Sequence, residues 1–298
     1  MSDLLITIGM PVFNDVDFIE ESILSVLNQS FSDFELIISD DGSSDGSADI
    51  CKQYAEKDSR VRYVRQAKNL GISKNMEWLL NQSKNKYFVW AGDDDLMDEL
   101  YIETLFNALE NDPHCVSAFT PCYLIDENNK PWSELLDISY SNSKKSKRLN
   151  FYIKNATDYF GYGMFVREKI KDVKFPIWKW PNKNTPYNNI YPTLAYYLCQ
   201  GDYIQCGEKA MFFKRVKPVS KENHALVGKG SAIKETFAYW LRKLNLVNFT
   251  AKLIRKSQGF GFMLKHYPFL FYYWFMKPSY AQFKLAGSSF WRNKILSK

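Results

Sequence analysis

Residues 34–45 read Phe-Glu-Leu-Ile-Ile-Ser-Asp-Asp-Gly-Ser-Ser-Asp, and residues 87–95 read Tyr-Phe-Val-Trp-Ala-Gly-Asp-Asp-Asp. Each stretch is a short apolar run that ends in an acidic turn containing glycine. Short apolar runs bounded by turn residues are typical of strands buried inside a parallel sheet. The two stretches therefore predict strands that carry carboxylates at their carboxyl ends.

Strand and helix patterns alternate around these two stretches through the first hundred residues. Short links between alternating strands and helices favour an α/β fold, a mostly parallel sheet covered by helices on both faces. In such sheets ligands bind beyond the carboxyl ends of the strands, so we expect the residues after each strand to carry the chemistry. We expect Asp17 to cap the first helix and Asp45 or Ser47 to open the second. The predicted strands are 4–10, 34–39, 61–64 and 87–91, and the predicted helices are 17–27, 45–54, 72–80 and 98–109.

The pattern after residue 110 is less regular. Further strands are predicted within 116–125, 161–166 and 203–214, and a helix is predicted at 191–199. Residues 127–155 are rich in Asn, Ser and Lys, which favours a variable loop or a lid. From about residue 234 onward the chain changes to helices made of lysine, arginine and bulky aromatic residues.

The composition limits the class of protein. The 298 residues are 46% hydrophobic and 16% aromatic, which excludes disorder for most of the chain. Five cysteines without a C-x-x-C pair and three dispersed histidines argue against a zinc site and fit reduced thiols. Residues 1–16 lack a secretory pattern, and the dense apolar run 267–276 is shorter than the ~20 residues of a membrane-spanning helix. We therefore expect a cytoplasmic protein.

The charge is distributed unevenly along the chain. Residues 1–110 carry 21 acidic and 9 basic side chains, whereas residues 225–298 carry 1 acidic and 13 basic ones. Lys252, Arg255 and Lys256 share a predicted helical face, and 266–277 places aromatic residues between basic ones. This pattern favours an anionic membrane surface as a partner, at the inner face of the plasma membrane. The alternative is helices packed on the rest of the chain or in a homodimer interface. Nucleic acid is disfavoured because no recognised binding motif accompanies the charge.

Asp93, Asp94 and Asp95 form the strongest chemical signal. Three consecutive carboxylates after an apolar strand repel one another in a partly buried site, so a compensating cation is expected. A set of oxygen ligands suits Mg²⁺ or Mn²⁺. The alternative is a solvated acidic turn that caps the helix predicted at Asp98. In the other turn, Asp41 is placed to accept a hydrogen bond from a base or a ribose, although a simple turn with a helix cap explains the same residues.

Taken together, five segments resemble family 2 glycosyltransferases. The resemblance implies a GT-A-type fold, a Rossmann-like mixed sheet flanked by helices, that binds a nucleoside-diphosphate sugar and transfers the sugar with inversion. It implies a catalytic domain over 1–224, with a nucleotide-sugar half at 1–110 and an acceptor half at 111–224, followed by a helical extension at 225–298. The segments are Met10–Asn14, Val26–Ser30, Phe34–Asp45, Asn69–Ser73 and Gly92–Asp95.

The resemblance also implies roles for individual residues. In a GT-A-type enzyme a divalent ion under the diphosphate would be held by Asp94 and Asp95, and Asp94 is alternatively a contact to the ribose. Lys74 is expected either to assist at the nucleotide or to be a solvated lysine. The remaining residues implied in nucleotide binding are Pro11 and Phe13 beside the base, Asp41 reading it, and Asn14, Asn69, Gly71 and Asp93 close to it.

One part of the family pattern is missing. Inverting transfer needs a general base, which in the family is a carboxylate at the position that falls on Asn189. An asparagine side chain cannot accept the proton. Either the alignment is offset, or another acid supplies the base, or the activity is lost. The nearby acids are Asp158, Glu168, Asp172 and Asp202.

Residues 161–167 resemble the acceptor-side strand of the family, and the aromatic residues near it either stack on sugar rings or pack in the core. These are Trp178, Trp180, Tyr187 and Tyr191. We expect a UDP-linked donor and a glycan or lipid-linked glycan acceptor in bacterial surface polysaccharide synthesis. The alternative hypothesis is a catalytically inactive subunit that binds the nucleotide sugar or acts as a scaffold.

Overall fold

The computed structural model describes residues 5–133, 140, 144–155, 158–180, 183–188, 190–217 and 232–277. Its centre is a seven-stranded sheet with the strand order β11-β6-β8-β4-β1-β2-β3. The strands are β1 (Ile6–Val12), β2 (Phe34–Asp40), β3 (Val61–Arg65), β4 (Tyr87–Trp90), β6 (Cys115–Phe119), β8 (Met164–Val166) and β11 (Asp202–Gln205).

Most neighbours in this sheet are parallel, as the sequence predicts. Strand β1 pairs in parallel with β2 and β4, and β2 pairs in parallel with β3. Strand β8 is the exception, because it lies antiparallel between β4 and β6. The carboxyl ends of β1, β2, β3 and β4 therefore meet at one edge of the sheet, where the acidic turns follow.

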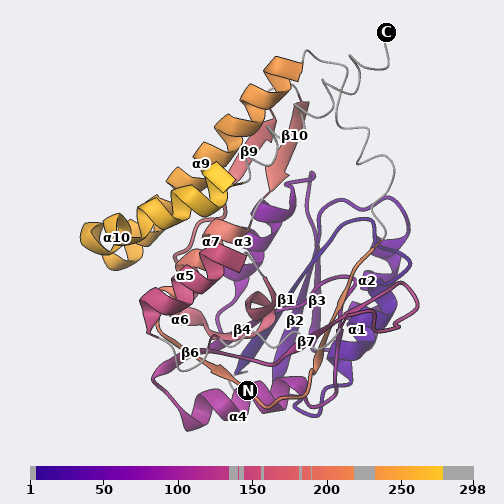
Figure 1. The fold of residues 1–298 in the computed structure, drawn as a ribbon. Coiled ribbons are helices and arrows are strands. Elements are labelled where there is room, and N and C mark those ends of the chain that lie inside the picture. Colours follow the sequence, from indigo (N-terminus) through magenta and orange to yellow (C-terminus); the bar gives the residue numbers. More distant parts are fainter. Residues whose placement is uncertain are drawn as a thin grey trace.

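Helices cover both faces of the sheet (Figure 1). The sheet separates two hydrophobic cores. Side chains alternate along β4, so that Phe88 and Trp90 belong to one core and Tyr87 and Val89 to the other. The first core contains residues of α3 (Ile72–Gln82), α5 (Lys145–Asn155) and α7 (Tyr191–Leu198). The second core contains residues of α1 (Ile19–Leu27), α2 (Ser47–Lys57) and α4 (Tyr101–Asn111).

A small second sheet, a hairpin and two short helices are the remaining elements among the described residues up to 217. The order β5-β12-β7 forms a second sheet, and β9 pairs with β10 as a hairpin. Strand β12 matters for the site because it carries residues from far along the chain back to the turn after β4. The elements are β5 (Leu96–Met97), β7 (Cys122–Ile125), β9 (Ile177–Trp180), β10 (Lys183–Asn188), β12 (Phe212–Arg215), η1 (Tyr159–Tyr162) and α6 (Arg167–Ile170).

Several local predictions are wrong. The strand predicted at 116–125 is two strands in different sheets, and 159–162 is a short helix before β8. Helix α5 lies inside the predicted loop 127–155. The prediction missed it because its buried stripe of Leu149, Tyr152 and Ile153 is narrow and lies among many polar residues. Asp17 does not cap α1, whose first turn instead donates backbone N–H groups to the carbonyl of Asp15. Asp45 does accept the backbone N–H of Ser47 at the start of α2.

The C-terminal helices are α9 (Ala232–Gln258), α10 (Phe260–Phe271) and the π-helical turn η2 (Tyr272–Met276). They pack against α5 and α7, and their buried residues belong to the first core. The indole of Trp274 donates to the carbonyl of Ile153 at 2.8 Å, and the Gln258 amide donates to the carbonyl of Cys199 at 2.7 Å. Packing on the rest of the chain, one of the two interpretations of this basic aromatic segment, is thus observed. Within the described part of the chain, no helix combines the length and apolarity needed to cross a bilayer.

Candidate functional site

A cavity of about 720 Å³ opens at the edge where β1, β2, β3 and β4 end. Its wall is built from the turns that follow these strands, as the sequence predicts for a parallel sheet. Lys74 is not among the residues that line this cavity, and its ammonium pairs with Glu77 at 2.9 Å. Asn189 lies outside the described residues. The predicted site residues that do line the cavity are Pro11, Phe13, Asn14, Asp41, Asn69, Gly71, Asp93, Asp94, Asp95 and Asp158.

Asp41 anchors the loop that follows β3. Its carboxylate accepts the backbone N–H of Leu70 at 2.7 Å and of Gly71 at 2.8 Å, and the side chain is buried. Gly71 has a φ of 78°, which glycine adopts without strain. Burial raises the pKa of Asp41 despite these two hydrogen bonds. An ionised carboxylate has about four acceptor sites, so two remain for a ligand N–H or hydroxyl.

The turn after β1 is fixed against the turns after β2 and β4. The Asn14 side-chain oxygen accepts the backbone N–H of Ser44 at 2.8 Å, and the Asn14 N–H donates to the Ser43 hydroxyl at 3.0 Å. The Phe13 N–H donates to Asp93 at 3.1 Å. The Phe13 ring is 48% exposed at the cavity. An immobilised backbone with an exposed ring is suited to stacking against a planar ligand.

Three carboxylates gather at the centre of the cavity wall. Oxygen atoms of Asp15, Asp93 and Asp94 lie within 4.8 Å of one another. Burial, together with the charges of Asp15 and Asp94, raises the pKa of Asp93 to about 7. Such a set of hard oxygen ligands is the kind that Mg²⁺ and Mn²⁺ prefer, so the residues fit a divalent ion. Asp15 was not among the residues that the sequence singled out.

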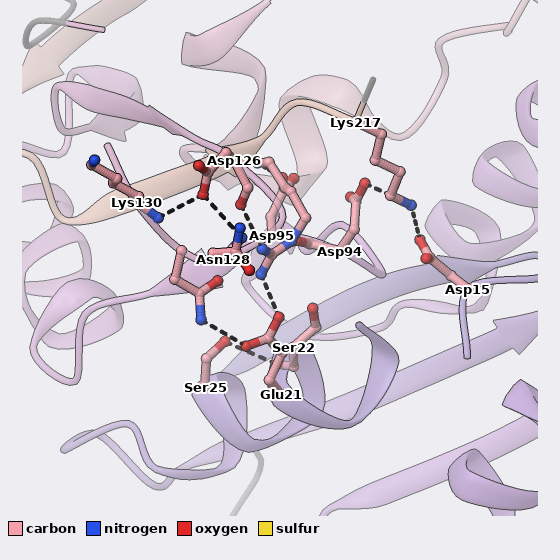
Figure 2. Close-up of polar contacts among 12 residues, drawn as sticks. Asp15, Glu21, Ser22, Ser25, Asp94, Asp95, Asp126, Asn128, Lys130 and Lys217 are labelled. Atoms are coloured by element: carbon pink, nitrogen blue, oxygen red, sulfur yellow. Dashed lines mark hydrogen bonds and ion pairs between the residues drawn. The ribbon is translucent and has the colours of Figure 1, made fainter. Parts of the chain in front are cut away.

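An ammonium group already lies in this cluster. Figure 2 shows the side chain of Lys217 between Asp15 and Asp94. Its Nζ lies 3.0 Å from a carboxylate oxygen of Asp94 and also contacts the carboxylate of Asp15. Burial alone would lower the pKa of Lys217, but these two carboxylates raise it. Lys217 follows β12 and is 202 residues from Asp15, so no local sequence signal indicated it.

Asp95 stands apart from that cluster. Its side chain is buried and accepts the backbone N–H of Arg215 at 2.9 Å. Burial and then the charge of Asp94 raise the pKa of Asp95 well above its ordinary value. Gly92 leaves room for this carboxylate, since a Cβ at Gly92 would lie 2.3 Å from an Asp95 oxygen. The contacts of Asp95 therefore hold the turn after β4 against β12.

Asp158, directly before η1, also lines the cavity. It accepts a hydrogen bond from the Lys214 ammonium at 2.7 Å. Burial would lower the pKa of Lys214, but the Tyr162 hydroxyl and the carboxylates of Asp158 and Asp95 raise it above its ordinary value. The carboxylate of Asp158 thus has the Lys214 ammonium as its ion-pair partner.

The other three acids near the expected base lie elsewhere. Glu168 is exposed on α6 and pairs with Lys171. Asp172 is exposed after α6, and its carbonyl accepts a hydrogen bond from Lys256. Asp202 begins β11 at the amino edge of the sheet, opposite the cavity, and pairs with Arg148 at 2.9 Å. Among these acids, only Asp158 is part of the described cavity wall.

Beyond Asp158 the cavity wall is apolar, which sequence reasoning did not predict. Trp90, Phe175, Leu194 and Tyr197 line the cavity, and all four are buried. The ring of Tyr191 packs near Tyr152 and Trp274, which agrees with a core role for that aromatic residue. The side chains of Trp178, Trp180 and Tyr187 lie outside the described residues.

Comparison with known sequences identifies a common family. The family model described as Glycosyl transferase family 2 matches residues 7–174. The glycosyltransferase GlyA of Streptococcus pneumoniae is 32% identical over 104 residues, 35% of this chain and 15% of GlyA. TuaG of Bacillus subtilis, named for teichuronic acid biosynthesis, is 29% identical over 132 residues, 44% of this chain and 52% of TuaG. The chain thus spans less than two thirds of the length of either relative.

Solved structures share the fold. TarS of S. aureus in complex with UDP superimposes with a TM-score of 0.59 at 15% identity, over 85% of this chain and 66% of that one. The mannosyltransferase PcManGT of Pyrobaculum calidifontis, in complex with GDP-Man and Mn²⁺, gives a TM-score of 0.52 at 16% identity, over 95% of this chain and 75% of that one. These similarities confirm the GT-A-type fold that the motifs predict.

Proposed function

Because this chain belongs to glycosyl transferase family 2, we propose that it moves a sugar from a nucleoside-diphosphate sugar to a glycan or lipid-linked glycan acceptor, with inversion. The observation that carries the proposal is one cavity that joins Asp41, the carboxylate cluster and Asp158. These groups supply a contact for a base or ribose, a site for a cation beneath a diphosphate, and an acid placed to accept a proton.

The nucleotide end of the cavity is assigned to the turns after β1, β2 and β3. In this proposal Pro11 and Phe13 flank the base, and Asp41 accepts a hydrogen bond from it. Asn69 and Gly71 belong to the loop that Asp41 already holds in place. UDP is the proposed nucleotide. The complexes of TarS with UDP and of PcManGT with GDP-Man support a nucleoside diphosphate as the ligand class.

The carboxylates of Asp15, Asp93 and Asp94 would hold Mn²⁺ or Mg²⁺. A bound ion of this kind would neutralise charge on the leaving diphosphate. Asp94 is the member of the predicted metal pair that fits this role. Asp95 is assigned to fixing the turn, because one of its oxygens accepts the Arg215 N–H and the other lies against Gly92.

Asp158 is the proposed general base. In an inverting transfer the acceptor oxygen forms a bond to the anomeric carbon while the bond from that carbon to the diphosphate oxygen breaks. The proton of the acceptor hydroxyl then passes to the carboxylate. Asp158 is proposed to take it because its carboxylate lines the same cavity as the carboxylate cluster, and Lys214 orients that carboxylate at 2.7 Å. This assignment replaces the carboxylate missing at Asn189.

Two experiments test the proposal. Differential scanning fluorimetry with UDP, GDP and CDP, each with Mn²⁺, should raise the melting temperature with UDP most, and the variant Asp41→Ala should lose the response. Turnover of a nucleotide sugar in the presence of Mn²⁺ would exclude the alternative of an inactive binding subunit. Absence of any nucleotide-dependent shift would contradict the proposed function.

We place the acceptor at the inner face of the plasma membrane, in bacterial surface polysaccharide synthesis. An exposed apolar ridge on α10 and η2 supports membrane attachment, with Phe260, Leu264, Tyr272 and Met276 each about half exposed at 49–54%. The guanidinium of Arg255 lies 5.3 Å from the Phe260 ring, and no acidic residue follows Glu235 in the sequence. Apolar side chains among cations suit an anionic lipid surface.

Substitution of the ridge tests this placement better than truncation, because α9 and α10 share the core of the fold. The double variant Leu264→Gln/Tyr272→Gln should lose flotation with phosphatidylglycerol vesicles and keep its melting temperature. Leu100→Gln, at a residue that is 47% exposed beside α4, is the matched control. Unchanged flotation, or loss of a dimer in light scattering instead, would contradict the membrane assignment.

A further inference from the structure

We propose that the ammonium of Lys217 occupies the position of the divalent ion in the carboxylate cluster while no nucleotide is bound. When a nucleoside diphosphate binds, the ammonium moves to the phosphates and the divalent ion takes its place among the carboxylates. This inference rests on the proposed function. It predicts that the enzyme binds a divalent ion tightly only together with the nucleotide.

The geometry places the ammonium where a cation is expected. The Nζ atom of Lys217 lies 3.0 Å from an Asp94 oxygen and contacts Asp15, which are two of the three members of the cluster (Figure 2). The third member, Asp93, has oxygen within 4.8 Å of theirs. A divalent ion shared by these carboxylates would therefore lie next to the ammonium. Like charges at such separations repel strongly in a partly buried site.

The backbone around Lys217 is fixed to the same turn. The Arg215 N–H donates to Asp95 at 2.9 Å, and the Arg215 Nε donates to the carbonyl of Asp94 at 2.8 Å. The Arg215 guanidinium also pairs with Glu21 of α1 and lies over the Phe18 ring. These contacts keep the backbone of Lys217 beside the cluster whether or not its side chain stays there.

The side chain itself is free to change partners. Lys217 lines the cavity, its side chain is 40% exposed, and its Nζ lies 5.2 Å from the Phe18 ring centroid. Its four-carbon stem allows the ammonium to move by several ångströms without moving the backbone. A diphosphate offers two or three negative charges and strong acceptor oxygens. Release of the carboxylates to a divalent ion is thus compensated by new contacts between the ammonium and the phosphates.

The charge balance favours such an exchange. In the described cluster, the carboxylates of Asp15, Asp93 and Asp94 face the ammonium of Lys217. Adding a divalent ion alone would crowd two cations into the cluster. Adding the ion together with a diphosphate leaves each cation with anionic partners.

The test measures Mn²⁺ binding rather than turnover. Free Mn²⁺ is counted by electron paramagnetic resonance for the wild-type chain, Lys217→Met and Lys217→Arg, each with and without UDP. Lys209→Met is the matched control, because Lys209 is 83% exposed and lies 4.0 Å from Asp98, outside the cavity. Melting temperatures confirm that each variant is folded.

We expect the wild-type chain to bind Mn²⁺ at least tenfold more tightly with UDP than without it, a ratio that reflects about one ion–ion contact. Lys217→Met should bind Mn²⁺ about tenfold more tightly than wild type without UDP, and should bind UDP more weakly. Lys217→Arg, which keeps the charge, should behave like wild type, as should Lys209→Met.

Two negative outcomes are distinguishable. If Lys217→Met and wild type bind Mn²⁺ equally without UDP, while both bind it with UDP, the proposed exchange between the Lys217 ammonium and the ion is wrong and the proposed function stands. If no chain binds Mn²⁺ under either condition, the metal assignment in the proposed function fails together with this inference.

Discussion

The two walls of the cavity are built in different ways. One wall consists of turns that directly follow parallel strands. Asp41 and Gly71 of this wall are fixed to each other, whereas Asp94 and Asp95 also contact Lys217 and Arg215 from the other wall. The other wall comes from η1, α7 and the end of β12, which meet only after the chain has crossed the sheet. The first wall supplies anionic and polar contacts, and the second supplies Asp158, Lys217 and part of the apolar surface. The comparison teaches that the turns of the first wall follow from local sequence patterns, whereas the second wall depends on packing between distant segments.

The largest expected effect tests the second wall. Asp158→Asn removes the proposed base without changing the size of the side chain, so kcat should fall by about 10² to 10⁴-fold. The affinity for UDP should stay unchanged, because Asp158 is not among the residues proposed to contact the nucleotide. Steady-state kinetics and UDP titration separate the two quantities.

Asp202→Asn is the control for that variant, because Asp202 pairs with Arg148 at the opposite edge of the sheet. Its kcat should equal that of the wild-type chain. If Asp158→Asn turns over substrate as fast as the wild-type chain, Asp158 is not the base, and the base is a group outside the four acids considered.

A second prediction concerns the first wall. Asp41→Ala removes the carboxylate that holds the backbone of residues 70 and 71 and that is proposed to contact the nucleotide. Loss of a charged hydrogen bond costs about 1.5–3 kcal/mol, so UDP affinity should fall by about 10 to 100-fold in calorimetry. Asp49→Ala is the control, since this acid of α2 is 85% exposed in its side chain. Unchanged UDP affinity would remove Asp41 from the nucleotide site.

A third prediction concerns the junction of the two walls. Gly92→Ala would place a Cβ 2.3 Å from an Asp95 oxygen, and it should lower the free energy of unfolding by about 1–3 kcal/mol. Gly261→Ala in α10 meets no atom within 4 Å and should leave stability equal or slightly higher. Urea denaturation of both variants gives the comparison. Equal stability of Gly92→Ala would show that the turn shifts freely.

The last prediction is a pH dependence. The pKa of Asp93 is raised to about 7 in the folded chain, so the folded state binds more protons than the unfolded state between about pH 4 and 7. With metal removed by EDTA, the contribution of Asp93 to stability should therefore fall as the pH rises through this window. Melting curves from pH 5 to 8 should show a smaller decline for Asp93→Asn than for wild type. An identical decline in both would mean that Asp93 titrates normally.

Much of the fold follows from the sequence because its signals are local. The apolar runs before Asp40 and Asp93 gave strands β2 and β4 within one residue of their observed ends. Helix α5 was missed because its buried stripe is narrow and surrounded by lysine and asparagine. The C-terminal segment shows the same limit, since its aromatic residues serve both the core, as Trp274 does, and the exposed ridge, as Tyr272 does.

The sequence by itself determined which turns would form the site, because residues that directly follow parallel strands must meet at one edge of the sheet. It therefore identified Asp41, Asp93 and Asp94 as cavity residues. Only the tertiary structure decided which charges face them. The contact between Lys217 and Asp15 spans 202 residues, and that between Arg215 and Asp95 spans 120. Such pairings depend on how β12 packs beside β5, which no periodicity along the chain records.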